Sequence, residues 1–149
     1  MNIKPIVELQ NLTKVIGNKK IIDDLSLSLY PGQITGFLGP NGAGKTTTIK
    51  TLMSLIFPTE GSAKILGCDI ADVQMHRRIG YCPENPYFYD YLTARELMDY
   101  FGELFGFDAA TRKAKTEELL TAVGLAENDW KRQLRKYSKG MLQRVGLAQ

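Results

Sequence analysis

Residues 39–46 read Gly-Pro-Asn-Gly-Ala-Gly-Lys-Thr, the complete Gly-x-x-x-x-Gly-Lys-Thr pattern of a phosphate-binding loop. The glycines of such a loop let consecutive backbone N–H groups point inward. The helix that follows directs the positive end of its dipole at the same anion. Lys45 would reach the β- and γ-phosphates, and Thr46 would contact magnesium. We predict that the chain binds ATP or GTP through its phosphates; the alternative is a glycine-rich turn without a ligand.

The pattern is specific only where it follows a buried strand and opens a helix. Residues 34–38 form a short apolar run suited to a buried parallel strand. Residues 47–56 carry apolar side chains at helical spacing. Both conditions are met. The predicted nucleotide-binding residues of this segment are Gly39, Pro40, Asn41, Gly42, Ala43, Gly44, Lys45, Thr46 and Thr47.

Strands are predicted on both sides of the loop. Residues 7–12 and 25–29 alternate apolar with polar side chains, the period of half-buried strands, and residues 17–20 supply turn material between them. This pattern indicates an antiparallel layer. Two further short strands are expected at residues 63–66 and 79–82.

Helical patterns follow Pro83. Thr93 and Glu96 form a capping box at the start of one helix, and Asp108 and Ser138 are placed to cap two more. The apolar side chains expected to pack are Leu97, Phe101, Leu104 and Phe105 on the first helix, Leu119, Leu120 and Val123 on the second, and Met141, Leu142, Val145 and Ala148 on the third.

Composition restricts the classes of protein to consider. The chain has 149 residues, of which 44% are hydrophobic, enough for one domain with a core or for a core plus a small subdomain. Lys and Arg number 19 and Asp and Glu 16, which gives a net charge of +3 without charge runs. Nothing in this balance argues for nucleic acid as a partner.

The remaining single residues point to an ordinary cytoplasmic chain. Cys68 and Cys82 lie outside any Cys-x-x-Cys pattern, and we expect both to be small buried hydrophobes in a reducing compartment. The lone histidine, His76, is expected at the surface. Residues 1–5 hold no apolar signal region, and no apolar stretch approaches the length of a membrane span.

Four segments carry a resemblance to a known family. They are residues 36–47, 58–61, 79–84 and 137–144, in that order. Together they resemble the ATP-binding cassette of ABC transporters, most closely the cassettes of drug and polysaccharide exporters. The resemblance covers essentially the whole chain. It implies an α/β fold with an incomplete P-loop NTPase core, an antiparallel β layer and a helical subdomain.

The resemblance also implies a division of the chain. Residues 1–82 would hold the P-loop core and the antiparallel layer, and residues 83–138 the Q-loop and the helical subdomain. Residues 139–149 would begin the signature helix that returns to the core. By resemblance the Q-loop glutamine contacts the magnesium site, and Glu84 occupies its position here. We expect this carboxylate either to serve Mg²⁺ or to be an exposed loop residue.

Aromatic residues follow Glu84 at high density. By resemblance they would help to contact a transmembrane permease subunit through the Q-loop and the helical subdomain. The alternative is that they belong to the core of that subdomain. They include Tyr87, Phe88, Tyr89 and Tyr91.

The family's signature motif is Leu-Ser-Gly-Gly-Gln, and residues 137–141 read Tyr-Ser-Lys-Gly-Met. Ser138 and Gly140 are retained. The resemblance implies that they form a second anion site for the γ-phosphate held by a second cassette, in a head-to-tail dimer. The alternative for Ser138 is a plain helix cap. Lys139 either favours the phosphate or faces solvent.

The family places an aromatic residue against adenine, and Ile16 occupies that position here. An aliphatic side chain contacts the base without stacking on it, so the choice between ATP and GTP stays open. Tyr30 is a weaker candidate for the same role, and its alternative is an ordinary aromatic at a strand end.

A working cassette also needs an aspartate for magnesium, a glutamate as general base and a histidine near the γ-phosphate. By resemblance all three follow the signature helix, and the sequence stops at Gln149 before them. We therefore assign no catalytic residue and expect residues 1–149 alone to bind ATP and Mg²⁺ without hydrolysis. Since a central strand would also be absent, we expect poor solubility or marginal stability for these residues made alone.

At the level of the family, the expected function is that of an ATPase subunit. It would couple ATP binding and hydrolysis to export of a substrate through a separate membrane subunit, from a peripheral position on the inner face of the cell membrane. Two alternatives remain. One is a soluble ABC protein without a membrane partner, and the other is a truncated, non-catalytic nucleotide-binding remnant.

Overall fold

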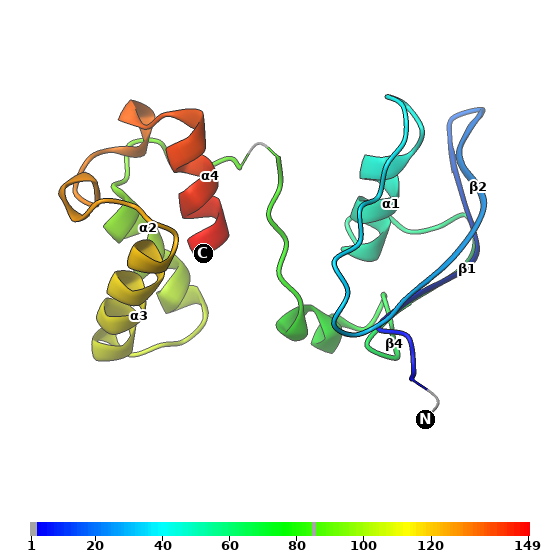
Figure 1. Ribbon diagram of the computed structural model, residues 1–149, viewed down its shortest axis with the longest axis horizontal. Helices are drawn as coiled ribbons and strands as arrows, with labels where there is room; N and C mark the ends of the chain where they lie inside the picture. The colour runs from blue at the N-terminus through cyan, green and yellow to red at the C-terminus, as the bar shows by residue number, and fades with distance from the viewer. Residues whose placement is uncertain (1–2, 85) are drawn as a thin grey trace. The chain divides into compact units, whose positions relative to one another are not determined.

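The computed structural model describes residues 3–84 and 86–149, so that Met1 and Asn2, two of the N-terminal residues discussed above, lie outside it. The chain divides into two units, Met1–Tyr81 and Cys82–Gln149. Figure 1 shows strands and helical segments in the first unit and a group of helices in the second. Each unit has its own buried core.

The first unit is built on an antiparallel sheet of order β2-β1-β3-β4. Its strands are β1 (Val7–Ile16), β2 (Lys19–Leu29), β3 (Glu60–Ile65) and β4 (Cys68–Asp69). The predicted antiparallel layer and the strand near residues 63–66 are thus confirmed. Side chains alternate between the two faces of a strand, so the apolar positions of β1 and β3 point into one core. The buried core residues are Leu9, Leu12, Ile22, Ala63, Ile65, Ile70 and Met75.

The helix predicted after the phosphate loop is α1 (Lys45–Leu52). It is shorter than the expected range of 47–56, and Ile49 on its surface is exposed rather than packed. Ser54 ends the helical path with a positive φ of 55°. A 3₁₀ helix, η1 (Val73–Arg78), follows the sheet and is capped by the Asp72 side chain.

The second unit contains α2 (Ala94–Leu104), α3 (Ala109–Ala122) and α4 (Lys139–Ala148), with α3 packed against both other helices. Two 3₁₀ turns, η2 (Glu127–Asp129) and η3 (Leu134–Lys136), connect α3 to α4. All three predicted caps are confirmed: Thr93 with Glu96 forms a full capping box on α2, Asp108 caps α3 and Ser138 caps α4.

The core of the second unit is formed by all three helices and the 3₁₀ turns. Leu97, Leu120 and Val145 are almost completely buried, one from each helix. Trp130 is buried beside them and donates a hydrogen bond of 2.9 Å from Nε1 to the Leu125 carbonyl oxygen. Arg95 lies over the Trp130 ring. Because α4 contributes Val145 and Ala148 to this core, it belongs to the second unit.

Several expectations about packing are wrong. Residues 34–38 and 79–82 form no strand, because no described residue supplies the hydrogen-bonding partner that a strand needs. Cys82 is exposed rather than buried, while Cys68 is half-buried. Of the four residues predicted to pack on the first helix, Leu97 is buried and Phe101 packs partly, whereas Leu104 and Phe105 are exposed. His76 is exposed, as predicted. None of the helices formed by the described residues has the length and apolar character needed to cross a membrane.

Candidate nucleotide site

The phosphate loop lies between β2 and α1 and depends on left-handed backbone at two glycines. Gly42 has a φ of 83° and Gly44 a φ of 86°, conformations that side chains strongly disfavour. Gly44 is also tightly seated on the sheet. A Cβ atom at this position would lie only 2.6 Å from the Ile21 carbonyl oxygen of β2. The last glycine of the loop therefore allows both the turn into α1 and the close approach to β2.

Lys45 closes the loop on itself. Its Nζ atom donates hydrogen bonds to the carbonyl oxygens of Gly39 (2.6 Å) and Pro40 (2.8 Å), at the start of the loop. The Ala43 backbone N–H donates to the same Pro40 oxygen at 3.2 Å. The ammonium group is thus held against the backbone at the start of the loop.

The start of α1 offers free donors to an anion. Gly44 is its N-cap and has no side chain to satisfy the first-turn N–H groups, which have no intrahelical acceptors. Thr46 is exposed at this end of the helix. Thr48 faces the opposite way, because its buried hydroxyl donates to the Gly44 carbonyl oxygen at 3.0 Å. The arrangement is chemically suited to bind phosphate groups, with a threonine hydroxyl available for a divalent cation.

The predicted base-contacting residue is at the tip of the β1–β2 hairpin. Ile16 is the last residue of β1, pairs with Lys19 and is 54% exposed. It is therefore free to contact a ligand. Tyr30 is 40% exposed just beyond the end of β2.

The predicted magnesium ligand Glu84 is an exposed residue of the second unit. Among residues 3–84 and 86–149, no three His, Cys, Asp or Glu side chains gather in a way that could hold a metal ion. Mg²⁺ is commonly held by one or two protein oxygens together with substrate phosphates. The residues present fit this kind of site, in which Thr46 would be the protein ligand and the nucleotide phosphates would supply the other oxygens.

Ser138 and Gly140 are exposed at the N-terminus of α4. The Ser138 Oγ atom accepts a hydrogen bond of 3.3 Å from the Met141 backbone N–H, so the residue is a helix cap in this structure. The preceding residue anchors this end of the helix. Tyr137 is buried, and its hydroxyl donates to the Asp129 carbonyl oxygen at 2.6 Å. Burial raises the pKa of the Tyr137 hydroxyl, which keeps it a hydrogen-bond donor at neutral pH.

The aromatic segment after Glu84 is divided between surface and core. Tyr87, Tyr89 and Tyr91 are exposed, whereas Phe88 is partly buried and packs against the core of the second unit. Tyr89 lies edge-on to Tyr100 of α2, with ring centroids 5.8 Å apart. The core alternative thus holds for Phe88, whereas the three tyrosines lie at the surface of the second unit.

Sequence reasoning missed a polar cluster in the hairpin below Ile16. Asn11 and Asp24 have positive φ values of 48° and 53°, and their side chains are hydrogen-bonded to each other. Thr13 and Thr59 accept backbone hydrogen bonds nearby. The signal was available: Asn and Asp are the side chains that tolerate left-handed backbone best, and both interrupt the strand pattern.

Comparison with known proteins settles the family. A family model described as ABC transporter matches residues 22–149, which is most of the chain. The chain belongs to the ABC transporter family. The solved structure of an ATP binding subunit of an ABC transporter matches with a TM-score of 0.81 and 29% sequence identity, over 96% of this chain and 60% of that chain. The fold is accordingly that of the P-loop NTPases, as predicted.

Relatives within the ABC transporter family are considerably longer than this chain. An ABC transporter ATP-binding protein of Synechocystis sp. is 48% identical over 135 residues, which cover 89% of this chain and 38% of the relative. The bacitracin transport ATP-binding protein BcrA of Bacillus licheniformis is 41% identical over 145 residues, or 96% of this chain and 46% of that protein. The chain therefore spans less than half the length of these curated relatives.

Proposed function

We propose that this chain is the nucleotide-binding part of an ATP-binding subunit of an ABC-type membrane transporter. The observation that supports it best is the phosphate loop, with its two left-handed glycines, its folded-back Lys45 and the uncapped N-terminus of α1. Lys45 and the loop N–H groups, with Thr47 at the first turn, bind the phosphates, Thr46 holds Mg²⁺ and Ile16 contacts the base. The bound Mg²⁺ would neutralise phosphate charge.

Binding experiments with the full-length protein test this assignment. We expect calorimetry to detect binding of MgATP, inorganic tripolyphosphate to compete with it, and adenosine alone to bind far more weakly, because the site recognises phosphates first. Tight adenosine binding without competition by tripolyphosphate would contradict the assignment.

For residues 1–149 alone we propose nucleotide binding without hydrolysis. No general base or switch histidine is assigned within this sequence, and the described residues hold no carboxylate cluster for a metal ion. Single-turnover hydrolysis of ATP at a detectable rate by these residues would refute the proposal.

We further propose that Ser138 and Gly140 bind the γ-phosphate held by a second cassette in a head-to-tail dimer. Their exposure at a helix N-terminus supports this role. The variant Ser138→Asp separates it from simple capping, because Asp caps a helix as well as Ser does but repels phosphate. We expect an unchanged melting temperature and a loss of ATP-dependent dimerisation in analytical ultracentrifugation. Normal dimerisation would leave Ser138 as a cap only.

The same subunit is proposed to bind a transmembrane permease through the exposed aromatic residues after Glu84, and so to lie on the inner face of the cell membrane. Tyr87 and Tyr91 are 101% and 60% exposed, which is unusual for aromatic side chains without a partner. Replacing both by Ser should reduce co-purification with the membrane subunit. Phe105→Ser, which changes an exposed aromatic elsewhere in the same unit, should not. Export as the direction of transport is part of this proposal.

A further inference from the structure

The hairpin that carries Ile16 is distorted at three places along its ladder. Between the pairs Leu9–Leu27 and Leu12–Leu25, β1 has one residue more than β2. Nearer the hairpin tip, the extra residues belong to β2 instead. β2 has one extra residue between Leu25 and Ile22, and another, Ile21, between Ile22 and Lys20. Each extra residue is a β-bulge, which bends and twists the strand that contains it.

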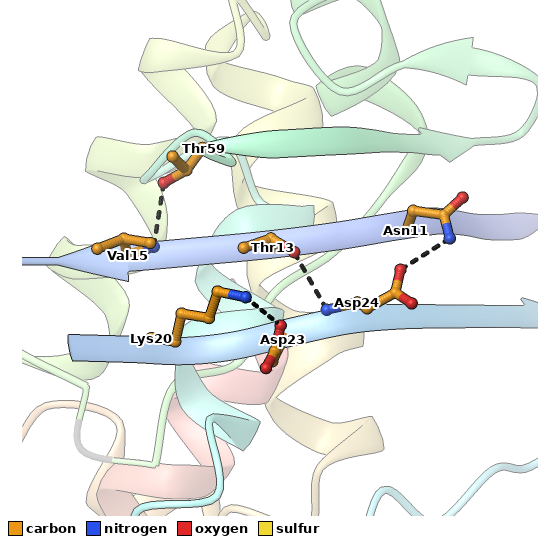
Figure 2. A network of polar contacts seen from close by, with 7 residues as sticks. All are labelled: Asn11, Thr13, Val15, Lys20, Asp23, Asp24 and Thr59. Atoms are coloured by element: carbon orange, nitrogen blue, oxygen red, sulfur yellow. Dashed lines mark hydrogen bonds and ion pairs between the residues drawn. The ribbon is translucent and has the colours of Figure 1, made fainter.

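A network of side chains fixes the first two bulges (Figure 2). Asn11 in β1 and Asp24 in β2 both have left-handed backbone, and Asn11 Nδ2 donates to Asp24 Oδ1 at 2.7 Å. The Asp24 backbone N–H, which the bulge removes from the regular ladder, donates to the buried Thr13 Oγ1 at 3.1 Å. Asn11 also donates from its backbone N–H to Ser26 Oγ at 3.0 Å.

Thr13 and Val15 also connect the hairpin to Thr59, the residue just before β3. The Val15 backbone N–H donates to Thr59 Oγ1 at 3.0 Å, and the Thr59 N–H donates to the Thr13 carbonyl oxygen at 2.8 Å. Gly61 fits beneath the bulge, because a Cβ atom there would lie 2.3 Å from the Asn11 carbonyl oxygen. The bend in the hairpin is therefore held from both sides, and Thr13 takes part in each set of contacts.

The third bulge meets the phosphate loop. Ile21, the extra residue of β2, presents the carbonyl oxygen against which Gly44 is seated. Ile16 pairs with Lys19, two residues before Ile21, so the base-contacting side chain stands roughly 7 Å along the hairpin from the seat of Gly44. One bent hairpin thus touches the phosphate loop near its tip and carries Ile16 at the tip itself.

We infer that the bulge network sets the position of the nucleoside contact relative to the phosphate loop, with Thr13, Asn11 and Asp24 as positioning residues. This role requires no contact between the three residues and the nucleotide. They fix the bend of the hairpin, and the bend decides where Ile16 stands when the phosphates occupy the loop. The inference rests on the proposed nucleotide binding and goes beyond it, because it concerns affinity for the nucleoside half of the ligand alone.

Two ligands separate the two halves of the site. ATP needs both the loop and the hairpin tip, whereas inorganic tripolyphosphate needs only the loop. In the full-length protein with Mg²⁺, we expect Thr13→Val, which keeps the side-chain shape but removes the Asp24 partner, to weaken ATP binding about fivefold, the effect of roughly one hydrogen bond. Tripolyphosphate affinity should stay the same. Thr13→Ser, which restores the hydroxyl, should return ATP affinity to the wild-type value.

Two further variants complete the test. Asn11→Gly accepts the positive φ without strain and removes only the bond to Asp24, so it should act in the same direction as Thr13→Val. Asp23→Asn is the matched control, because Asp23 is the neighbouring carboxylate, pairs with Lys20 at 2.7 Å and takes no part in the bulge contacts (Figure 2). It should change neither affinity.

The inference is overturned if ATP and tripolyphosphate affinities fall together, if neither falls, or if Thr13→Ser behaves like Thr13→Val. It is also overturned if the wild type binds both ligands equally, since the hairpin tip would then contribute nothing. In that case the phosphate site itself would still stand. A wild type that binds neither ligand would refute the proposed function and this inference with it.

Discussion

The ammonium nitrogen of Lys45 lies 2.6 Å from the carbonyl oxygen of Gly39, the first residue of its own loop. The lysine side chain thus connects the end of the loop to its beginning. Restraining the side chain in this way lowers the entropy lost when a ligand binds, because the ammonium group is already ordered. An incoming phosphate exchanges neutral carbonyl partners for anionic oxygens, which form stronger hydrogen bonds with an ammonium group.

Lys45→Ala should greatly weaken MgATP binding. Loss of one charge-assisted interaction corresponds to about 10- to 100-fold in affinity. The control is Lys50→Ala, which removes an exposed lysine from the last turn of the same helix and should leave affinity unchanged. Isothermal titration calorimetry measures both. An unchanged Kd in Lys45→Ala would show that the site is misplaced.

Gly44→Ala should damage both folding and binding, since the new methyl group meets the Ile21 carbonyl oxygen at 2.6 Å in a backbone conformation that disfavours side chains. Gly17→Ala is the matched control. Gly17 also has a positive φ, of 59°, but nothing lies within 4 Å of a Cβ there, so only the conformational cost of about 1–2 kcal/mol applies. Urea unfolding of both variants compares the two costs. Equal losses would mean that the loop is not tightly seated on β2.

Local signals in the sequence predicted local structure well. Thr93, Asp108 and Ser138 cap their helices because a cap needs only one side chain and the helix beside it. The strand expected at residues 34–38 failed for the opposite reason. An apolar run becomes a strand only where another strand supplies hydrogen bonds, and that partner is not encoded in the run itself.

The candidate site divides in the same way. The phosphate loop could be found from its pattern, because the backbone path of residues 39–46 follows from its glycines. The network around Thr13 could not be found in this way, because it depends on contacts between residues that are distant in the sequence. Thr13 is hydrogen-bonded to Asp24, 11 residues away, and to Thr59, 46 residues away. Asn11 and Asp24 were visible only as polar residues within strand patterns.

Low pH should reduce the stability that the capping box gives to the N-terminus of α2. The Thr93 backbone N–H donates a hydrogen bond to the Glu96 carboxylate and lowers the pKa of that carboxyl below its ordinary value. The Thr93 hydroxyl lowers this pKa as a second, smaller cause. A lowered pKa in the folded state means that the carboxylate stabilises the fold above the ordinary glutamate pKa, and that this contribution is lost as pH falls below about 4.

Glu96→Gln tests the origin of that loss, since glutamine keeps the capping geometry but does not titrate. Between pH 6 and pH 3, the melting temperature of the wild type should fall further than that of Glu96→Gln. Glu118→Gln removes an exposed carboxylate from α3 and should follow the wild type. Identical pH profiles for the wild type and Glu96→Gln would exclude the capping box as the acid-sensitive element.

Residues 1–149 made alone should aggregate through the segment before the phosphate loop. Ile34 and Leu38 are 105% and 91% exposed on a stretch that pairs with no strand formed by the described residues. We expect the double variant Ile34→Ser/Leu38→Ser to raise the soluble yield. Replacing the equally apolar but separate Leu104, which is 65% exposed on α2, should help less. Light scattering at increasing concentration measures the difference.

Trp130, buried in the second unit, is the only tryptophan of the sequence, and the unit that holds the phosphate loop has none. Intrinsic fluorescence excited at the red edge of absorption therefore reports on the helical unit alone. Emission that changes when nucleotide is added would mean that binding in one unit is felt in the other, without any label. If calorimetry detects nucleotide binding while the Trp130 emission stays unchanged, binding does not alter the surroundings of Trp130.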